Sequence, residues 1–262
     1  MELNKIYNED CLVGMKRIPD KSIDMILCDL PYGTTQNKWD SIIDLDLLWE
    51  QYERIIKDNG AIVLTAQAPF NIILGSKKLE WLRYEWVWEK TTATGHLNAN
   101  KMPMKAHEDV LVFGKQDHEH LLVFYNNLPS YNPQKKSGHV RKVSSAKHKI
   151  NSKVTSNYRE FGLTSYDSTE RFPRSVIKFS TDKQKEAFHP TQKPVALFEW
   201  LIKTYTNVSD VVLDNCMGSA TTAVACMNTD RNFIGFEKEK SYFELGNKRI
   251  AENTKQLNLL EV

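Results

Sequence analysis

An acid, a proline and a tyrosine follow an apolar run near the start of the chain. Residues 22–27, SIDMIL, are rich enough in Ile and Leu to form a buried parallel strand, and CDLPYG comes next. Pro31 fixes its own φ and keeps Leu30 out of the helical conformation. The pattern predicts a carboxylate (Asp29), a directed peptide carbonyl (Leu30) and an aromatic ring (Tyr32) at the carboxyl end of a strand. The plainer alternative is a proline turn with an exposed tyrosine.

A second acidic pair brackets a small-residue loop near the end of the chain. Asp214 ends the apolar run DVVLD, Gly218 lies in the loop that follows, and Glu237 ends the next apolar run about 20 residues later. Only one glycine of a G-x-G-x-x-G fingerprint is present, so a pyrophosphate is not expected. An adenosine cofactor without phosphate, S-adenosylmethionine (AdoMet), fits better, with Glu237 on the ribose hydroxyls and Asp214 facing the methionine ammonium. The alternative is an ordinary strand, turn and helix with a solvated Glu237.

Positive charge is concentrated in one segment, although the whole chain carries a formal charge of only +2. Residues 131–160 contain one acid, Glu160, and the basic residues Lys135, Lys136, Arg141, Lys142, Lys147, Lys149, Lys153 and Arg159. Such a segment suits contacts with phosphate oxygens, and Arg171, Arg174 and Lys178 would extend the surface. A solvated loop would have much the same composition.

Strand and helix patterns alternate on both sides of this segment. Strands are predicted at 23–30, 61–67, 83–90, 108–115, 210–216 and 232–238, and helices at 44–60, 70–79, 195–206, 221–228 and 241–257. The alternation predicts an α/β fold with a mostly parallel twisted sheet, helices on both faces and an antiparallel hairpin at one edge. Residues 116–187 lose this periodicity and are predicted to be an insertion.

Together with HPTQKP at 189–194, these motifs make the sequence resemble the β-group DNA amino methyltransferases, which methylate an exocyclic base nitrogen from AdoMet. The order agrees with that family: DLPY first, the recognition region second, and the AdoMet loop last. The likeness also includes the opening segment, WEK, Asn98, HEDVLVFGK and GFEKEKSYFELGNKRI. It covers most of the chain outside the insertion. Leu30 replaces the family's commoner proline, and Cys216 and Ala220 stand where Phe and Gly are usual, which bears on cofactor affinity.

The resemblance implies a Rossmann-like methyltransferase with a catalytic half at 1–115, a target-recognition insertion at 116–187 and an AdoMet-binding half at 188–262. It implies catalytic roles for Asp29, Leu30, Pro31 and Tyr32. The residues implied for AdoMet are Asp10, Cys11, Asp29, Thr191, Gln192, Lys193, Asp214, Cys216, Gly218, Ser219, Thr221 and Glu237. Those implied for DNA are Lys135, Lys136, Arg141, Lys142, Lys147, Lys149 and Lys153.

The expected reaction is methylation of adenine N6 in a nucleotide flipped out of duplex DNA. The amine's lone pair is delocalised into the ring, and hydrogen bonds to the Asp29 carboxylate and the Leu30 carbonyl would free it for attack. Tyr32 would stack on the base. Asp at the first motif position favours adenine, and cytosine N4 is the second candidate. Methylation of RNA or of a protein glutamine would pose the same chemistry. A DNA-binding protein on a decayed methyltransferase scaffold is the other alternative, which the intact Asp29, Tyr32, Asp214 and Glu237 oppose. The basic segment weighs against a protein substrate.

Other classes of function find little support. The four cysteines have no CxxC spacing, no signal segment or apolar membrane span is seen, and a reduced, cytoplasmic protein is expected. His107 and Glu108, and likewise His189, lack a third ligand at a recognisable spacing, so they are interpreted as structural hydrogen-bonding groups and no metal is expected. The recognition sequence, a homodimer and a separately acting restriction endonuclease are left open.

Overall fold

A computed structural model describes residues 1–33, 40–94, 96, 99–115, 129–144, 166–180 and 192–260. The chain divides into two compact units. One consists of Met1–Asn132 together with Ser175–Val262, and the other of Pro133–Arg174. Each unit is described by itself.

The larger unit is built on an eight-stranded sheet with the order β1-β10-β9-β2-β3-β5-β4-β8. The neighbours from β1 to β3 in this order all run parallel, whereas β5 is antiparallel to both β3 and β4, and β4 is parallel to β8. The predicted mostly parallel sheet with an antiparallel hairpin, β4 and β5, is confirmed, but β8 lies outside this hairpin and forms the edge. The strands are β1 Lys5–Tyr7, β2 Ile23–Asp29, β3 Ile56–Ala66, β4 Leu82–Thr94, β5 Lys105–Phe113, β8 Val176–Phe179, β9 Val211–Asp214 and β10 Asn232–Phe236.

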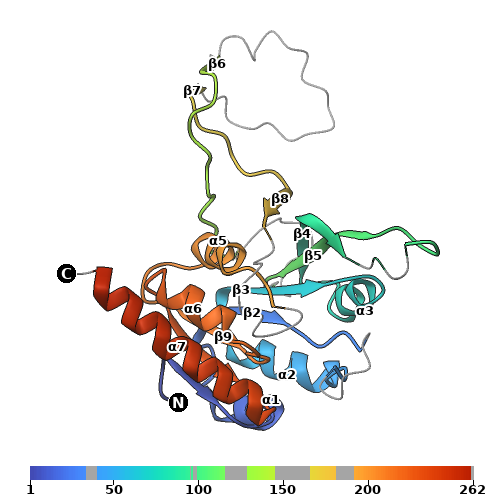
Figure 1. Ribbon diagram of the computed structural model, residues 1–262, viewed down its shortest axis with the longest axis vertical. Coiled ribbons are helices and arrows are strands. Elements are labelled where there is room, and N and C mark those ends of the chain that lie inside the picture. The colour runs from blue at the N-terminus through green and yellow to red at the C-terminus, as the bar shows by residue number, and fades with distance from the viewer. Residues whose placement is uncertain are drawn as a thin grey trace, which may run out of the picture. The chain divides into compact units, whose positions relative to one another are not determined.

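Helices cover both faces of this sheet, as predicted (Figure 1). One face carries α1 Cys11–Gly14, α2 Leu45–Ile55 and α3 Phe70–Lys77, with a short 3₁₀ turn at Met15–Arg17. The opposite face carries α5 Val195–Tyr205 and α6 Thr221–Met227. The last helix, α7 Lys240–Leu260, packs against α6 and β1.

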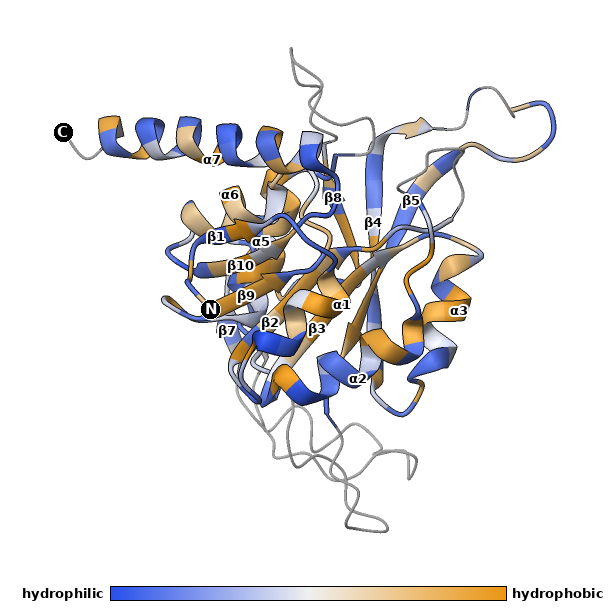
Figure 2. Cartoon of the chain, turned by 90° about the horizontal axis from the view of Figure 1, so that it is seen from below, coloured by the Kyte–Doolittle hydropathy of each residue, from blue (hydrophilic) through white to orange (hydrophobic). Residues whose placement is uncertain are grey.

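The alternation of side chains along β2 explains why the sheet needs helices on both sides. Ile26 and Cys28 belong to the core under α1 and α2, whereas Met25 and Leu27 belong to the core under α5 and α6. All four are fully buried. A strand that is apolar on both faces must be covered on both. Figure 2 shows β2, β3 and β9 mostly in the colour of hydrophobic residues.

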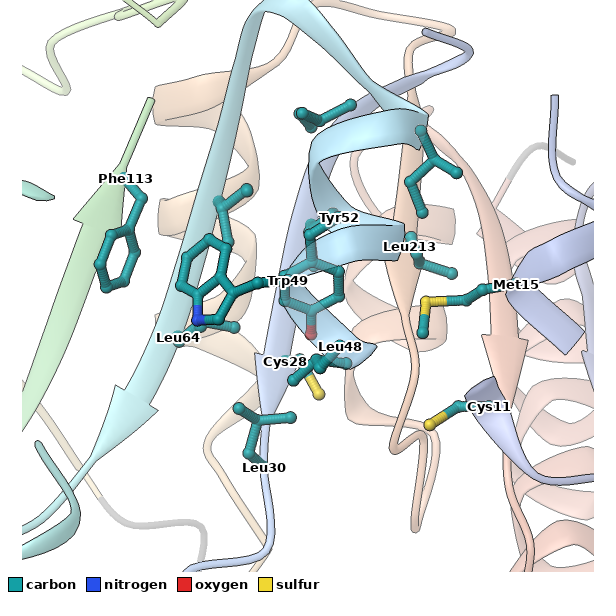
Figure 3. Packing of buried hydrophobic residues seen from close by; sticks show 14 of the residues in the cluster. Cys11, Met15, Cys28, Leu30, Leu48, Trp49, Tyr52, Leu64, Phe113 and Leu213 are labelled. Carbon is teal, nitrogen blue, oxygen red and sulfur yellow. The ribbon is translucent and has the colours of Figure 1, made fainter. Parts of the chain in front are cut away.

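The core beneath α2 fixes the position of the DLPY segment. Trp49 and Tyr52 of α2 meet edge to face at 5.6 Å, and both belong to the cluster that contains Cys28 and Leu30 (Figure 3). Leu30 is only 3% exposed. Its side chain therefore anchors the segment in the core and leaves the flanking Asp29 at the strand end.

Helix α2 ends earlier than the sequence pattern predicts. The pattern extends the helix to Gly60, but α2 ends at Ile55 and β3 begins at Ile56. A Cβ at Gly60 would lie 2.7 Å from the Ile56 side chain and 2.9 Å from the Asp24 carbonyl oxygen. Gly60 is thus required for a close approach inside the strand, at a register shift between β2 and β3, and it does not cap a helix.

The smaller unit, Pro133–Arg174, contains a two-stranded antiparallel sheet. Strand β6 Lys142–Ser144 pairs with β7 Tyr166–Ser168, and an isolated bridge joins Lys136 to Arg171. Arg171 donates to the carbonyls of Ser168 at 3.0 Å and Glu170 at 2.7 Å. Arg171 therefore holds the backbone of this unit together.

Candidate active site and cofactor loop

Parallel strands bring the predicted acids to one edge of the sheet. Asp29 ends β2, Asp214 ends β9 and Glu237 directly follows β10. Since these strands and their neighbours run parallel, their carboxyl ends lie at the same edge. Ligands of open α/β sheets bind at this edge, so these three acids mark the candidate site.

The Asp29 carboxylate is held from two sides. Its Oδ1 accepts hydrogen bonds from the Tyr32 hydroxyl at 2.7 Å and from the Thr65 hydroxyl. Its Oδ2 accepts from Lys193 Nζ at 2.7 Å. The Asp29 side chain is 26% exposed and that of Lys193 is 7% exposed. The predicted catalytic acid and the lysine of HPTQKP, far apart in the sequence, thus meet directly.

A second carboxylate, Glu108, lies behind Lys193. Lys193 Nζ is 3.2 Å from Glu108 Oε2, and Lys90 Nζ is 2.6 Å from Oε1, which also accepts from Gln67 Nε2 at 2.7 Å. The side chains of Lys90 and Glu108 are both 5% exposed. The interpretation of Glu108 as a structural hydrogen-bonding group did not foresee that Glu108 shares the ion-pair partner Lys193 with Asp29.

The charges of this cluster sustain one another. Burial raises the pKa of Glu108, but the ammonium groups of Lys193 and Lys90 outweigh it, so this pKa lies below its usual range. Burial lowers the pKa of Lys193, but Asp29, Tyr32 and Glu108 outweigh it and hold this pKa well above the usual range. Both groups are therefore charged at neutral pH.

Tyr32 lies against the apolar floor of the site. Its ring stacks on Phe70 with centroids 5.3 Å apart and an angle of 28° between the planes. Lys193 Nζ lies 5.5 Å from the same ring's centroid. Burial and the neighbouring Asp29 charge raise the pKa of Tyr32 well above its usual value, so its hydroxyl stays protonated and donates to Asp29.

The loop between β9 and α6 has the conformation expected of a small-residue turn. Gly218 has a φ of +50°, and its N–H donates to Glu237 Oε2 at 2.8 Å, while the Glu239 N–H donates to Oε1 at 2.8 Å. Among the described residues, a Cβ at Gly218 would have only the Cys216 carbonyl oxygen within 4 Å, at 3.9 Å. The space beside Gly218 is therefore open, with the Glu237 carboxylate next to it.

Asp214 is buried beneath this loop. Its Oδ1 accepts from the Cys216 N–H at 3.0 Å, and its Oδ2 accepts from the Thr222 hydroxyl. Burial raises its pKa to about 6 although both hydrogen bonds lower it. These contacts make Asp214 a support of the loop, and its contact with a ligand ammonium stays a prediction.

Asp10 and Cys11 lie at the start of α1, and Cys11 is linked to Cys216 through Asn215. Asp10 caps α1 by accepting from the Leu12 N–H at 2.9 Å. The Asn215 side-chain nitrogen lies 3.7 Å from the Cys11 sulfur and 3.5 Å from the Cys216 sulfur. The two predicted thiols therefore share one amide, which sequence reasoning did not identify.

A buried arginine, also missed from the sequence, fastens the loop to α7. Arg249 is 8% exposed and donates to the Ser219 carbonyl at 2.8 Å and to the Thr221 hydroxyl at 3.1 Å. The Thr221 hydroxyl also lies 3.4 Å from the Lys193 carbonyl oxygen. Ser219 and Thr221 thereby connect the glycine loop to the segment that carries Lys193.

Gln192 completes the described part of HPTQKP. Its side-chain nitrogen is buried and has no hydrogen-bond partner within the ranges that the structure describes. A buried donor without a partner suits a ligand acceptor. Thr191, the other predicted member of this group, lies outside the described residues.

The predicted DNA-binding residues fall into three groups. Lys135 pairs with Glu170 at 3.2 Å, and Arg141 donates two hydrogen bonds to Asp167 at 2.7 and 2.5 Å. The side chains of Lys136 and Lys142 have no ion-pair partner among the residues with described positions. The remaining predicted residues, which lie outside the described part, are Lys147, Lys149 and Lys153.

Two further expectations concern groups of residues. Across the described ranges, no cluster of three or more His, Cys, Asp or Glu side chains is arranged to hold a metal ion. Among the same residues, no helix is both long and apolar enough to cross a membrane.

A protein-family model described as DNA methylase matches residues 23–248, so the chain belongs to this family of N6/N4 DNA methyltransferases. The match spans Asp29, Glu108, Lys193, Gly218 and Glu237. The enzyme is an AdoMet-dependent DNA methyltransferase, and the open space at Gly218, the adjoining Glu237 and the unpartnered Gln192 nitrogen fit that cofactor.

Curated relatives cover nearly the whole chain. The type II methyltransferase M.HinfI of Haemophilus influenzae is 26% identical over 99% of this chain and 72% of its own length. The DNA adenine methyltransferase YhdJ of Escherichia coli is 28% identical over 95% of this chain and 83% of its own length.

Solved structures confirm the Rossmann-like methyltransferase fold. M1.HpyAVI in complex with SAM has a TM-score of 0.59 and 25% identity, and the match covers 94% of this chain and 98% of that one. The cytosine-N4-specific PvuII DNA methyltransferase has a TM-score of 0.65 at 15% identity, covering 96% and 91%. At that identity, the second likeness concerns the fold alone.

Proposed function

We propose that this enzyme transfers the methyl group of AdoMet to the exocyclic N6 of an adenine flipped out of duplex DNA. The observation that carries the proposal is the position of Asp29. Its carboxylate stands at the end of β2, held by Lys193, at the same sheet edge as Gly218 and Glu237. The name of the relative YhdJ, a DNA adenine methyltransferase, supports adenine as the base.

Asp29 and the Leu30 carbonyl are proposed to accept the two N–H bonds of the adenine amine. These hydrogen bonds direct the nitrogen lone pair out of the ring plane, which orients the amine for in-line attack. In the structure, Asp29 Oδ1 already holds the hydroxyls of Tyr32 and Thr65. The amine must therefore replace or share one of these neutral donors.

Tyr32 is proposed to stack on the flipped base. Phe70 stacks on this ring and Lys193 Nζ lies 5.5 Å from its centroid, so the base is expected on the part of the ring that these two groups leave open. Flipping costs a few kcal/mol, which this stacking helps to offset.

AdoMet supplies an electrophilic methyl group on a sulfonium. Transfer of the methyl group would leave the sulfur as a neutral thioether and the nitrogen positively charged. The charged nitrogen would be more acidic than the neutral amine, so Asp29 or water could take its proton.

The cofactor is proposed to lie over the ends of β9, β10 and β2. Glu237 would accept hydrogen bonds from the ribose hydroxyls, Asp10 and Cys11 would border the adenine, and Gln192 and Lys193 would border the methionine part. Pro133–Arg174, within the predicted insertion 116–187, is proposed to contact DNA phosphates. A homodimer and a cognate endonuclease stay predictions.

Product analysis tests this proposal. The enzyme is incubated with unmodified genomic DNA and AdoMet, and the DNA is digested and analysed for methylated nucleosides. N6-methyladenine is expected, whereas N4-methylcytosine as the main product would make cytosine the target base in place of adenine.

Two variants test the role of Asp29 in the same assay. Asp29→Ala is expected to lose about 100- to 1,000-fold or more in turnover, because it removes the charged acceptor, while AdoMet still binds. Asp46→Ala is the control, since the Asp46 side chain is 79% exposed and, within the described part of the chain, forms an ion pair only with Lys77. Turnover by Asp29→Ala at the rate of this control would remove Asp29 from the mechanism.

A further inference from the structure

Four side chains of alternating charge extend from the proposed amine acceptor into the sheet. In order they are Asp29, Lys193, Glu108 and Lys90, with successive contacts of 2.7, 3.2 and 2.6 Å. Exposure falls along this series, from 26% for Asp29 to 7% for Lys193 and 5% for the last two. Glu108 and Lys90, at the far end of the series, lie too deep to touch the flipped base, and Asp29 is the most exposed of the four.

Strand geometry explains how these residues reach one another. Asp29 is in phase with Met25 and Leu27, on the face of the sheet that carries α5 and α6. Glu108 is in phase with Val110 and Val112 on the same face, and Lys193 comes just before Pro194, the N-cap residue of α5.

The pairing register supplies the remaining neighbours. Asp29 pairs with Thr65 across β2 and β3, and Trp88, two residues before Lys90, pairs with Glu108 across β4 and β5. Asp29 of β2 and Glu108 of β5 thus meet at Lys193, and Thr65 of β3 and Lys90 of β4 lie behind these two acids.

Glu108 determines how Lys193 can bind Asp29. Glu108 Oε1 is occupied by Lys90 and Gln67, whereas the buried Oε2 makes no well-aligned hydrogen bond within the described residues and depends on the ion pair with Lys193. Lys193 is therefore pulled toward two carboxylates at once. Its ammonium group is fixed in position, and its charge is shared between them.

We propose that Glu108, supported by Lys90, is a positioning residue for methyl transfer, acting through Lys193 to orient the Asp29 carboxylate. This inference rests on the proposed role of Asp29. Lys193 occupies Oδ2 with a charged donor, and only the neutral hydroxyls of Tyr32 and Thr65 occupy Oδ1. Lys193 therefore adds a direct attraction between opposite charges at Oδ2 that the hydroxyl donors at Oδ1 lack, so the incoming amine exchanges at Oδ1.

The test compares Glu108→Gln and Glu108→Asp with the control Glu89→Gln. Glu89 lies on β4 next to Lys90, but it pairs at the surface with Lys178 at 2.7 Å, and its side chain is 46% exposed. Turnover, KM for AdoMet and KM for duplex DNA are measured from neutral to alkaline pH. Urea titration of each variant establishes that it is folded under the assay conditions.

For Glu108→Gln, kcat is expected to fall by about 10- to 100-fold, because small displacements of a reacting group have effects of this size. KM for AdoMet should change little. Glu108→Asp, which keeps the charge on a shorter side chain, should recover part of the rate, and Glu89→Gln should match the wild type.

The pH at which kcat declines on the alkaline side distinguishes a positioning role from a merely structural one. A structural role of Glu108 would leave that pH unchanged. The groups facing Lys193 are Asp29 and Tyr32 from the end of β2 and Glu108 from β5, with Lys90 of β4 behind Glu108. Removing Glu108 removes one of the charges that raise the pKa of Lys193. In Glu108→Gln, kcat should therefore decline at lower pH than in the wild type.

The outcomes separate this inference from the proposed function. Wild-type kcat in Glu108→Gln, or a loss of kcat without movement of the alkaline limb, would overturn the positioning role. If Glu108→Gln does not fold, Glu108→Asp must show a smaller fall in kcat and a smaller shift of the alkaline limb to lower pH. The absence of either change in Glu108→Asp would also overturn the positioning role. Retained turnover by Asp29→Ala, measured alongside, would overturn the role of Asp29 itself.

Discussion

Two buried acids near the same edge of the sheet, Glu108 and Asp214, differ in their partners and not in their burial. They are 5% and 3% exposed. Glu108 faces two ammonium groups, and its pKa lies below the usual range. Asp214 accepts from a backbone N–H and a hydroxyl, both neutral, and its pKa rises to about 6.

The difference shows that two kinds of support adjoin the site. Around Glu108, buried charges compensate one another and fix the orientation of charged groups, at the risk that loss of one member leaves the others uncompensated. Around Asp214, neutral donors shape a loop, and their hydrogen bonds offset only part of the free-energy cost of burying the carboxylate charge. The first arrangement suits a group that holds a reacting amine, and the second suits a backbone turn.

The largest expected effect comes from removing the shared cation. Lys193→Met leaves Asp29 without its charged partner and Glu108 with Lys90 alone. Breaking a buried ion pair in this way costs about 3–5 kcal/mol, so the free energy of unfolding at pH 7 should fall by about that amount, with loss of turnover. Urea denaturation measures the first and methyl incorporation the second.

Acid should weaken this effect. The folded-state pKa of Glu108 lies below 4.5, so its ion pairs stabilise the wild type above that pH and are lost as the pH falls through the folded value. The difference in the free energy of unfolding between Lys193→Met and the wild type should therefore become smaller as the pH falls. Lys178→Met, which breaks a surface pair, is the matched control. Equal stability losses in the two variants would contradict the compensated cluster.

A smaller effect of opposite pH dependence is expected at Asp214. Its folded-state pKa of about 6 exceeds the ordinary 3.8, so the wild type loses stability as the pH rises from about 4 to 6. A shift of this size corresponds to about 3 kcal/mol at most. Asp214→Asn does not ionise, so its stability relative to the wild type should increase by up to that amount between pH 4 and 7.

Urea denaturation at both pH values measures this difference. Taking the difference between variant and wild type removes the contributions of other titrating groups. A variant that becomes relatively less stable with rising pH would show that the hydrogen bonds from Cys216 and Thr222 outweigh the burial of the charge.

The sequence could predict the acids at the strand ends but not the network behind them. Asp29, Asp214 and Glu237 each follow an apolar run, and parallel strands align such ends without any knowledge of register. Lys90 and Glu108 are also in phase with buried positions of their strands, which is a usable signal. Their meeting depends on the β4–β5 register, which a single sequence does not specify.

Other differences have similar causes. The early end of α2 reflects tertiary pairing of Ile56 with β2, which overrides a continuous helical pattern. Strands β1 and β8 are three and four residues long, too short for a periodic signal, and the chain positions of both are set by pairing with β10 and β4. Arg249, on α7, has no local signal because its partners Ser219 and Thr221 lie far from it in the sequence.

The smallest expected effect concerns the exposed cations of Pro133–Arg174, where the contrast between paired and unpaired charge recurs at the surface. Lys136 and Lys142 have no ion-pair partner in the described structure, whereas Lys135 and Arg141 face Glu170 and Asp167. If this unit meets phosphates, Lys136→Gln with Lys142→Gln should weaken DNA binding equally for all sequences. It should also lower the slope of log K against log salt by about 2.

The matched control neutralises the paired cations, Lys135→Gln with Arg141→Gln. Each of these cations can contact a phosphate only by giving up an acid that already holds it, and the freed acid then repels DNA. This control should therefore lower the salt slope less than the first pair does, although binding also weakens. Fluorescence anisotropy with one duplex over a series of salt concentrations measures both slopes. Equal salt slopes for the wild type and the Lys136, Lys142 variant would mean that these two lysines do not contact phosphate. A larger change of the salt slope in the control than in the Lys136, Lys142 variant would mean that pairing with Glu170 and Asp167 does not limit which cations bind DNA.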